Sequence, residues 1–107
     1  MSATERIKAL VQGHPVVLFM KGTPQFPMCG FSSRAVEALK KVDAKITPVN
    51  VLEDPELRAD LPRYSDWPTF PQLFVNGELI GGCDIVTDLY DSGELRRIVA
   101  EAQKDAV

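Results

Sequence analysis

The chain has 107 residues, of which 45% are hydrophobic and 25% are charged, and its formal net charge is −3 at pH 7. This length and apolar fraction provide a core without disulfides or a structural metal, so we expect a single domain over residues 1–107. The negative charge argues against nucleic acid as a partner, and no apolar run approaches the roughly 20 residues that span a bilayer. Residues 1–6 lack the pattern of a signal peptide, so we expect a soluble, cytoplasmic protein.

The first half of the chain predicts a helix, a buried strand, a second helix and an edge strand. Residues 2–5 read Ser-Ala-Thr-Glu, the spacing of a capping box, and begin a helix with one apolar face. Residues 16–20 form a continuous apolar run, which is typical of a strand buried on both faces. A loop with one glycine and two prolines follows, and a helical pattern resumes at Gly30. Residues 46–51 predict a second strand, and Pro48 confines it to a sheet edge because proline cannot donate to the ladder.

The second half predicts a helix, a hairpin and two further helices. Asp54-Pro55 is a strong helix start, a side-chain cap followed by proline, and we expect the helix to end or bend near Pro62. Residues 72–80 predict a β-hairpin around an Asn-Gly turn. The Gly81-Gly82 pair leads into another helix, which Ser92-Gly93 separates from the last one.

The resulting element order, α-β-α-β-α-β-β-α-α, indicates an α/β protein. The first strand–helix–strand unit should be parallel with a right-handed crossover, whereas the two strands of the hairpin must be antiparallel. We therefore expect a four-stranded mixed sheet flanked by helices, which is the thioredoxin-like arrangement.

The candidate chemistry centres on Cys29, one of two cysteines that lie far apart in the chain. Cys29 stands between the first predicted strand and the helix after it, where the helix N-terminus favours a thiolate and Lys21 can add a positive charge. A dithiol redox enzyme would have its second cysteine at the place of Ser32. The predicted site can therefore bond a thiol or a metal, but it cannot form a local disulfide.

Four motifs stand in order along the chain: Lys-Gly-Thr at 21–23, Pro-Met-Cys-Gly-Phe-Ser at 27–32, Trp-Pro-Thr-Phe-Pro-Gln at 67–72 and Gly-Gly-Cys-Asp at 81–84. Together they resemble the Cys-Gly-Phe-Ser monothiol glutaredoxins, and the resemblance covers about residues 2–103. It implies the glutaredoxin form of the thioredoxin-like fold and a site for glutathione.

The resemblance implies how the first part of glutathione would be bound. Lys21 and Arg58 are expected to clamp its glycyl carboxylate. Thr69, Phe70 and Pro71 are expected beside its cysteinyl part. A cis Phe70–Pro71 bond, as in thioredoxin-like proteins, would turn the backbone N–H and C=O of Phe70 outward to pair with that part like an added strand.

The Gly82, Cys83 and Asp84 segment is expected to bind the γ-glutamyl end of glutathione. The free N–H groups of Cys83 and Asp84 at a helix N-terminus would take its carboxylate. The carboxylate of Asp84 would take its ammonium group while also capping the helix. Trp67 is expected to pack over helix ends rather than to contact a ligand.

A [2Fe–2S] cluster needs four ligands, usually thiolates, which is more than the two cysteines of one chain can supply. Two chains could use Cys29 and Cys83 from each, or Cys29 and one glutathione thiolate from each. The resemblance favours the second arrangement, with the cluster bridging a homodimer. It also implies a BolA-like partner and transfer to apo iron–sulfur proteins. We therefore expect a cluster carrier in iron–sulfur biogenesis, with at most weak enzymatic activity.

The alternative is a glutathione-dependent thiol–disulfide oxidoreductase that removes glutathione from protein thiols. Its monothiol step needs only Cys29 and free glutathione, and Cys83 could act as a distant resolving thiol. The resemblance implies that the loop from Gly22 to Pro27 places glutathione poorly for attack, which weakens this alternative. A thioredoxin-like binding module without chemistry fits the electropositive setting of Cys29 badly.

Overall fold

The computed structural model describes residues 1–105, and its helices and strands follow the predicted order with one short 3-10 turn added. The elements are α1 (Ala3–Gly13), β1 (Val16–Met20), α2 (Gly30–Lys41), β2 (Thr47–Asn50), η1 (Val51–Glu53), α3 (Pro55–Ser65), β3 (Gln72–Val75), β4 (Glu78–Gly81), α4 (Cys83–Ser92) and α5 (Glu94–Asp105).

The strands form one four-stranded mixed sheet in the order β2-β1-β3-β4. β1 pairs in parallel with β2, whereas β3 is antiparallel to both β1 and β4. Pro48 lies on β2 at the edge of the sheet, opposite Leu18 of β1. The sequence-based predictions of the sheet, of its parallel unit and of its antiparallel hairpin are therefore confirmed.

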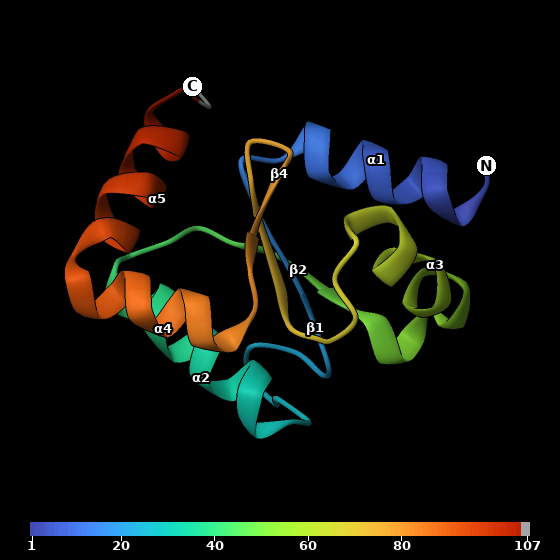
Figure 1. Cartoon of the computed structure of the whole chain (residues 1–107), viewed down its shortest axis with the longest axis horizontal. Helices are drawn as coiled ribbons and strands as arrows, with labels where there is room; N and C mark the ends of the chain where they lie inside the picture. The colour runs from blue at the N-terminus through green and yellow to red at the C-terminus, as the bar shows by residue number, and fades with distance from the viewer. Residues whose placement is uncertain (106–107) are drawn as a thin grey trace.

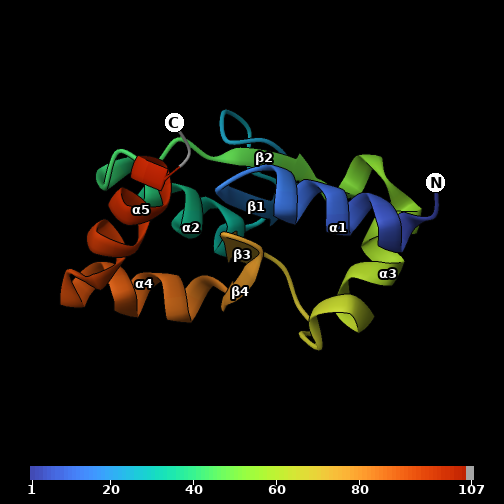
Figure 2. The ribbon, with the colours of Figure 1, turned by 90° about the horizontal axis from the view of Figure 1, so that it is seen from above.

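The helices cover both faces of the sheet, with α1 and α3 on one face and α2, α4 and α5 on the other (Figures 1 and 2). The side chains of β1 alternate between these layers. Val16, Leu18 and Met20 belong to the core under α2, α4 and α5, whereas Val17 and Phe19 belong to the core under α1 and α3. Burial on both faces explains why this strand is a continuous apolar run rather than an alternating one.

Local sequence signals position the ends of several elements. Ser2 and Glu5 form the predicted capping box at the start of α1, and Asp54 caps α3 by accepting a hydrogen bond from the backbone N–H of Leu57. Asn76 and Gly77 both have positive φ values, 50° and 81°, as a tight hairpin turn requires. Within the described residues, no helix has the length and apolar character that crossing a membrane needs.

The prediction that α3 ends or bends near Pro62 is wrong about the end, because the helix continues to Ser65. Proline removes one helical hydrogen bond but has a φ that suits a helix. Beyond it, the Ser65 hydroxyl donates to the carbonyl of Leu61 at 2.9 Å, and the Trp67 N–H donates to the carbonyl of Pro62 at 3.1 Å. These bonds close the last turn, and Asp66 then ends the helix with a left-handed backbone.

Candidate functional site

A pocket of about 900 Å³ lies among the end of β1, the starts of α2 and α4, helix α3 and the loop before β3. This volume lies within the range of about 300–1,000 Å³ that small-molecule sites occupy. Of the residues predicted for the site, the structure brings these to its wall: Lys21, Cys29, Arg58, Thr69, Phe70, Gly82, Cys83 and Asp84. Pro71 is buried and does not line the pocket, although the Phe70–Pro71 bond is cis as predicted.

Cys29 is the N-cap residue of α2 and is partly exposed at the pocket. Its side chain makes no regular capping hydrogen bond, but the pKa of its thiol is lowered. The largest cause is the backbone N–H of Ser32, which outweighs the opposing effect of partial burial. The backbone N–H of Phe31, the charge of Lys21 and the Ser32 hydroxyl lower the pKa further. The helix start thus favours a reactive thiolate that faces the pocket.

Ser32 is fully buried, and its hydroxyl oxygen accepts a hydrogen bond from the backbone N–H of Lys21 at 3.1 Å. The residue at the resolving position therefore links the end of β1 to the first turn of α2. Since Lys21 and Cys29 both line the pocket, this contact fixes the backbone that carries Lys21 relative to the helix start that carries Cys29. Reasoning from the sequence treated Ser32 only as a missing cysteine and overlooked this contact.

The loop between Lys21 and Cys29 is a tightly closed turn. The Lys21 carbonyl accepts from the Met28 N–H at 2.9 Å, and the side-chain oxygen of Asn50 accepts from the N–H groups of Gly22 and Leu52, each at 3.0 Å. Gly22 has a φ of 91°, and a Cβ atom there would lie 2.5 Å from a backbone carbonyl. The close packing of this corner requires glycine.

Arg58 is exposed and lies in the first turn of α3, and it is the second cation of the pocket wall. Its backbone N–H donates to the carbonyl of Asp54 at 2.9 Å. The helix start that Asp54 and Pro55 specify therefore determines where Arg58 leaves the backbone. Lys21 and Arg58 give the pocket two positive charges, and Asp84 supplies a negative one.

The loop before β3 is held by Gln72, a fully buried residue that was predicted to end the motif at 67–72 and to begin the hairpin, with no role in holding this loop. Its side-chain amide nitrogen donates to the carbonyls of Trp67 and Thr69, at 2.9 and 3.1 Å. Trp67 lines the pocket as well as lying against the start of α4, so the expectation that it only packs over helix ends was incomplete. The aromatic side chain in this motif was the signal that could have identified it.

The start of α4 forms the opposite wall. A Cβ atom on Gly82 would lie 3.2 Å from both the Pro71 carbonyl oxygen and the Trp67 indole nitrogen, so glycine lets the helix start approach this loop. The first hydrogen bond of α4 joins the Val86 N–H to the Gly82 carbonyl at 3.0 Å. The N–H groups of Cys83 and Asp84 come before this first bond, so they have no partner within the helix. Free N–H groups of this kind at a helix N-terminus are the usual setting for binding an anion.

The prediction that Asp84 caps α4 is wrong, because the N-cap residue is Gly82. The helix begins at Cys83, so Asp84 lies inside the first turn, where a carboxylate cannot act as the cap. Its side chain is exposed at the pocket wall. It still places a negative charge near the helix N-terminus.

The pocket wall also includes four residues that were not among the predicted site residues: Phe31, Pro62, Pro68 and Ile85. Phe31 is 54% exposed although it is aromatic, and the guanidinium of Arg34 lies 5.3 Å from its ring centroid. The pocket wall therefore combines the charged side chains of Lys21, Arg58 and Asp84 with apolar side chains.

The described part of the chain has no group of three or more His, Cys, Asp or Glu residues that could hold a metal ion. Cys29 and Cys83 are both free thiols at the pocket wall, and only Cys29 is more than slightly exposed. A donor set of this kind fits a metal cluster only if further ligands come from outside one chain.

Comparison with known proteins gives consistent similarities. The glutaredoxin family model matches residues 16–80. Glutaredoxin 4 of Escherichia coli (strain K12) is 49% identical over 102 residues, which cover 94% of this chain and 89% of that protein. The solution structure of reduced apo GrxS14 from poplar is 50% identical, with a TM-score of 0.79, and covers 92% of this chain and 91% of its own. The crystal structure of a buckwheat glutaredoxin–glutathione complex is 26% identical, with a TM-score of 0.83. The match covers 94% of this chain and 90% of the buckwheat chain. The predicted thioredoxin-like glutaredoxin fold is thereby confirmed.

Proposed function

The chain belongs to the glutaredoxin family, and from this premise we propose that it is a monothiol glutaredoxin that carries a glutathione-ligated [2Fe–2S] cluster. The observation that supports this most is the pairing of Cys29 with Ser32. The Cys29 thiol has a lowered pKa and faces the pocket, whereas Ser32 is buried and bonded to Lys21. The site therefore offers one partly exposed thiolate, and the resolving position of a dithiol enzyme, residue 32, carries no thiol with which it could form a local disulfide.

Glutathione is the ligand that the charges of the pocket fit. Its two carboxylates and its ammonium group call for cations at one end, and for N–H donors with an anion at the other. Lys21 and Arg58 would bind the glycyl carboxylate, and the first N–H groups of α4 with Asp84 would bind the γ-glutamyl end. Thr69, Phe70 and the neighbouring Pro71 would adjoin the cysteinyl part. The similarity to a glutaredoxin whose structure was solved with glutathione supports this assignment.

The cluster is the cargo in this proposal. Two chains would each supply Cys29 and one bound glutathione, which together provide the four thiolates that a [2Fe–2S] cluster needs. Cys83 would contribute mainly its backbone, because its side chain is buried. The homodimer would exchange ligands with apo iron–sulfur proteins, and a BolA-like protein would form a mixed complex around the same cluster.

Anaerobic reconstitution tests the proposal. The chain would be incubated with iron and sulfide, with and without glutathione, and then examined by visible absorbance and size-exclusion chromatography. We expect cluster absorbance that elutes with a dimer and appears only when glutathione is present.

The same experiment separates the alternatives. A cluster that forms without glutathione and is lost in Cys83→Ser would favour four protein thiolates. No cluster under either condition, together with rapid glutathione–disulfide turnover, would favour the oxidoreductase.

A further inference from the structure

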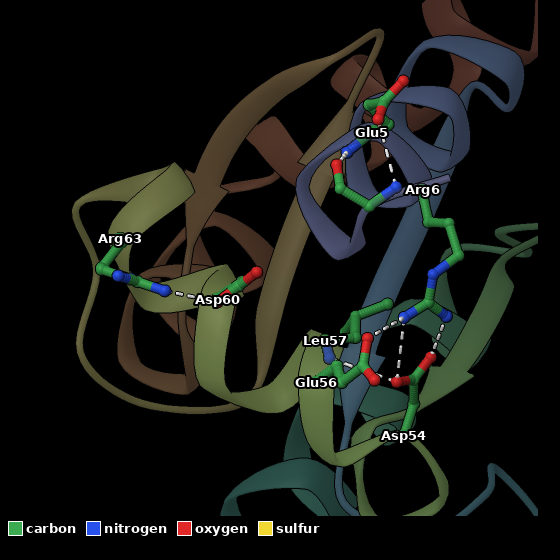
Figure 3. Close-up of polar contacts among 8 residues, drawn as sticks. Glu5, Arg6, Asp54, Glu56, Leu57, Asp60 and Arg63 are labelled. Carbon is green, nitrogen blue, oxygen red and sulfur yellow. Dashed lines mark hydrogen bonds and ion pairs between the residues drawn. The ribbon is translucent and has the colours of Figure 1, made fainter.

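Helices α1 and α3 are joined by an ion pair that lies outside the pocket (Figure 3). The guanidinium of Arg6 on α1 donates two hydrogen bonds to the carboxylate of Asp54, one from each terminal nitrogen, and the Nη2–Oδ1 distance is 3.2 Å. A carboxylate oxygen of Glu56 lies 3.9 Å from the same Nη2 atom. A two-point contact of this kind fixes both the distance and the orientation of its partners.

This ion pair differs from the others in the described residues. The pairs of Arg63 with Asp60, and of Arg97 with its two glutamates, lie within single helices at spacings of three or four residues. Among the ion pairs within residues 1–105, only those of Arg6 join two elements. Arg6 contacts a residue 48 positions away in the sequence.

Asp54 connects this ion pair to the pocket. One of its carboxylate oxygens accepts the capping hydrogen bond from the Leu57 N–H at 3.2 Å, and its carbonyl accepts from the Arg58 N–H at 2.9 Å. The residue that Arg6 holds therefore fixes the turn from which Arg58 extends. α1 is itself anchored, because its residues Ile7 and Val11 are buried in the core.

We propose that Arg6 is a positioning residue of the pocket. By holding Asp54, it fixes the first turn of α3 and so orients the Arg58 side chain toward the carboxylate of the bound ligand. This inference rests on the proposed glutathione site. The side chains of Arg6 and Asp54 are 35% and 27% exposed, so the contact lies near the surface and away from the cores that hold the sheet together. Loss of this ion pair should therefore change the orientation of the Arg58 side chain more than it destabilises the fold.

A double-mutant cycle tests the inference with reduced glutathione as the probe. Affinity would be measured by NMR titration for the wild type, Arg6→Ala, Arg58→Ala and the double variant. We expect Arg58→Ala to weaken binding about tenfold and Arg6→Ala about threefold. In the double variant, Arg6→Ala should add nothing, because the side chain that it positions is already absent.

Further variants separate positioning from a general effect on stability. Asp54→Asn keeps a capping side chain on α3 but removes the charge, so it should reproduce Arg6→Ala. Arg6→Lys should recover part of the affinity. Arg63→Ala removes an exposed pair farther along the same helix and is the matched control, with unchanged affinity expected. Glutathione with an amidated glycyl carboxylate should bind wild type and Arg6→Ala equally.

The outcomes are distinguishable. Unchanged affinity in Arg6→Ala and Asp54→Asn, with a loss in Arg58→Ala, would overturn the positioning role and leave the proposed function intact. Additive losses in the double variant would also overturn it. If the wild type does not bind glutathione, the proposed function fails, and this inference fails with it.

Discussion

The two cationic sides of the pocket are built in different ways. On the sulfur side, the fully buried Ser32 accepts a hydrogen bond from the Lys21 N–H, and the partly buried Asn50 accepts one from the adjacent Gly22. On the α3 side, Arg58 depends on a helix start that is tied to α1 by the partly exposed pair of Arg6 and Asp54. One side is fixed by neutral hydrogen bonds to the backbone, and the other by charges close to solvent.

This difference has consequences for how each side responds to its surroundings. Neutral hydrogen bonds to buried groups are insensitive to salt and to pH, and they are costly to break. An ion pair near the surface is screened by salt and depends on the ionisation of its carboxylate. We therefore infer that the thiol geometry is the constant part of the site and that the carboxylate clamp is the adjustable part.

The largest expected effect is on the sulfur side. Cys29→Ser should abolish cluster binding, because a serine hydroxyl does not ionise near neutral pH and is a poor substitute for a thiolate. Visible absorbance after anaerobic reconstitution with glutathione measures the loss. Cys83→Ser is the matched control and should retain most of the cluster. Survival of the full signal in Cys29→Ser would show that this cysteine is not the ligand.

The second prediction tests the close packing of the loop that carries Lys21. In Gly22→Ala, the new Cβ would lie 2.5 Å from the Phe26 carbonyl oxygen and 2.6 Å from the Met28 backbone nitrogen, at a φ of 91°. We expect a loss of about 2–4 kcal/mol in the free energy of unfolding, measured by urea denaturation, together with weaker glutathione binding.

Gly13→Ala is the control for this substitution, because a Cβ there would meet nothing within 4 Å. It should leave glutathione affinity unchanged. Equal behaviour of the two variants would mean that the loop yields easily and that the sulfur side is not the constant one.

The parts of this fold that could be predicted from sequence are those with local causes. The capping box at Ser2, the cap at Asp54 and the hairpin turn at Asn76-Gly77 each act within four or five residues. The run from Val16 to Met20 predicted a strand buried on both faces, because no polar side chain interrupts it.

The errors arose where tertiary contacts decide. The pattern around Asp84 resembles a helix cap, but α4 begins at Cys83 with Gly82 as its N-cap, and Gly82 lies close to Trp67 and Pro71. The bonds from Gln72 to the Trp67 and Thr69 carbonyls span only five and three residues, but no cap or turn pattern in the sequence marks them. The pairing of Arg6 with Asp54 joins positions that only the folded chain brings together.

The third prediction concerns the pH dependence of the α3 side. Arg6 is the largest cause of the lowered pKa of Asp54. A carboxyl whose pKa is lower in the folded state stabilises the fold above its unfolded pKa of about 3.9, and this stabilisation is lost as the pH falls through its folded pKa. The difference in melting temperature between wild type and Arg6→Ala should therefore be present at pH 7, and it should shrink below about pH 3.9 and disappear as the pH falls through the folded pKa of Asp54.

Asn50→Ala provides the contrast to that titration. It removes two hydrogen bonds from a neutral side chain, at a cost of about 1–2 kcal/mol, and its deficit should persist where the Arg6→Ala deficit disappears. A pH-independent Arg6→Ala deficit would show that packing of the arginine side chain, rather than its charge, holds α3.

The smallest expected effect distinguishes the sources of the lowered Cys29 pKa. The backbone N–H of Ser32 is the leading cause, the charge of Lys21 contributes less, and the Ser32 hydroxyl contributes least. In the apo protein, the pH dependence of iodoacetamide alkylation should give a midpoint below the 8.5 or so of a free thiol. Ser32→Ala should raise this midpoint slightly and Lys21→Ala somewhat more, with both still below the free thiol because the backbone donors remain. A midpoint restored to the free-thiol value by Ser32→Ala would mean that the hydroxyl, and not the helix start, makes the sulfur reactive.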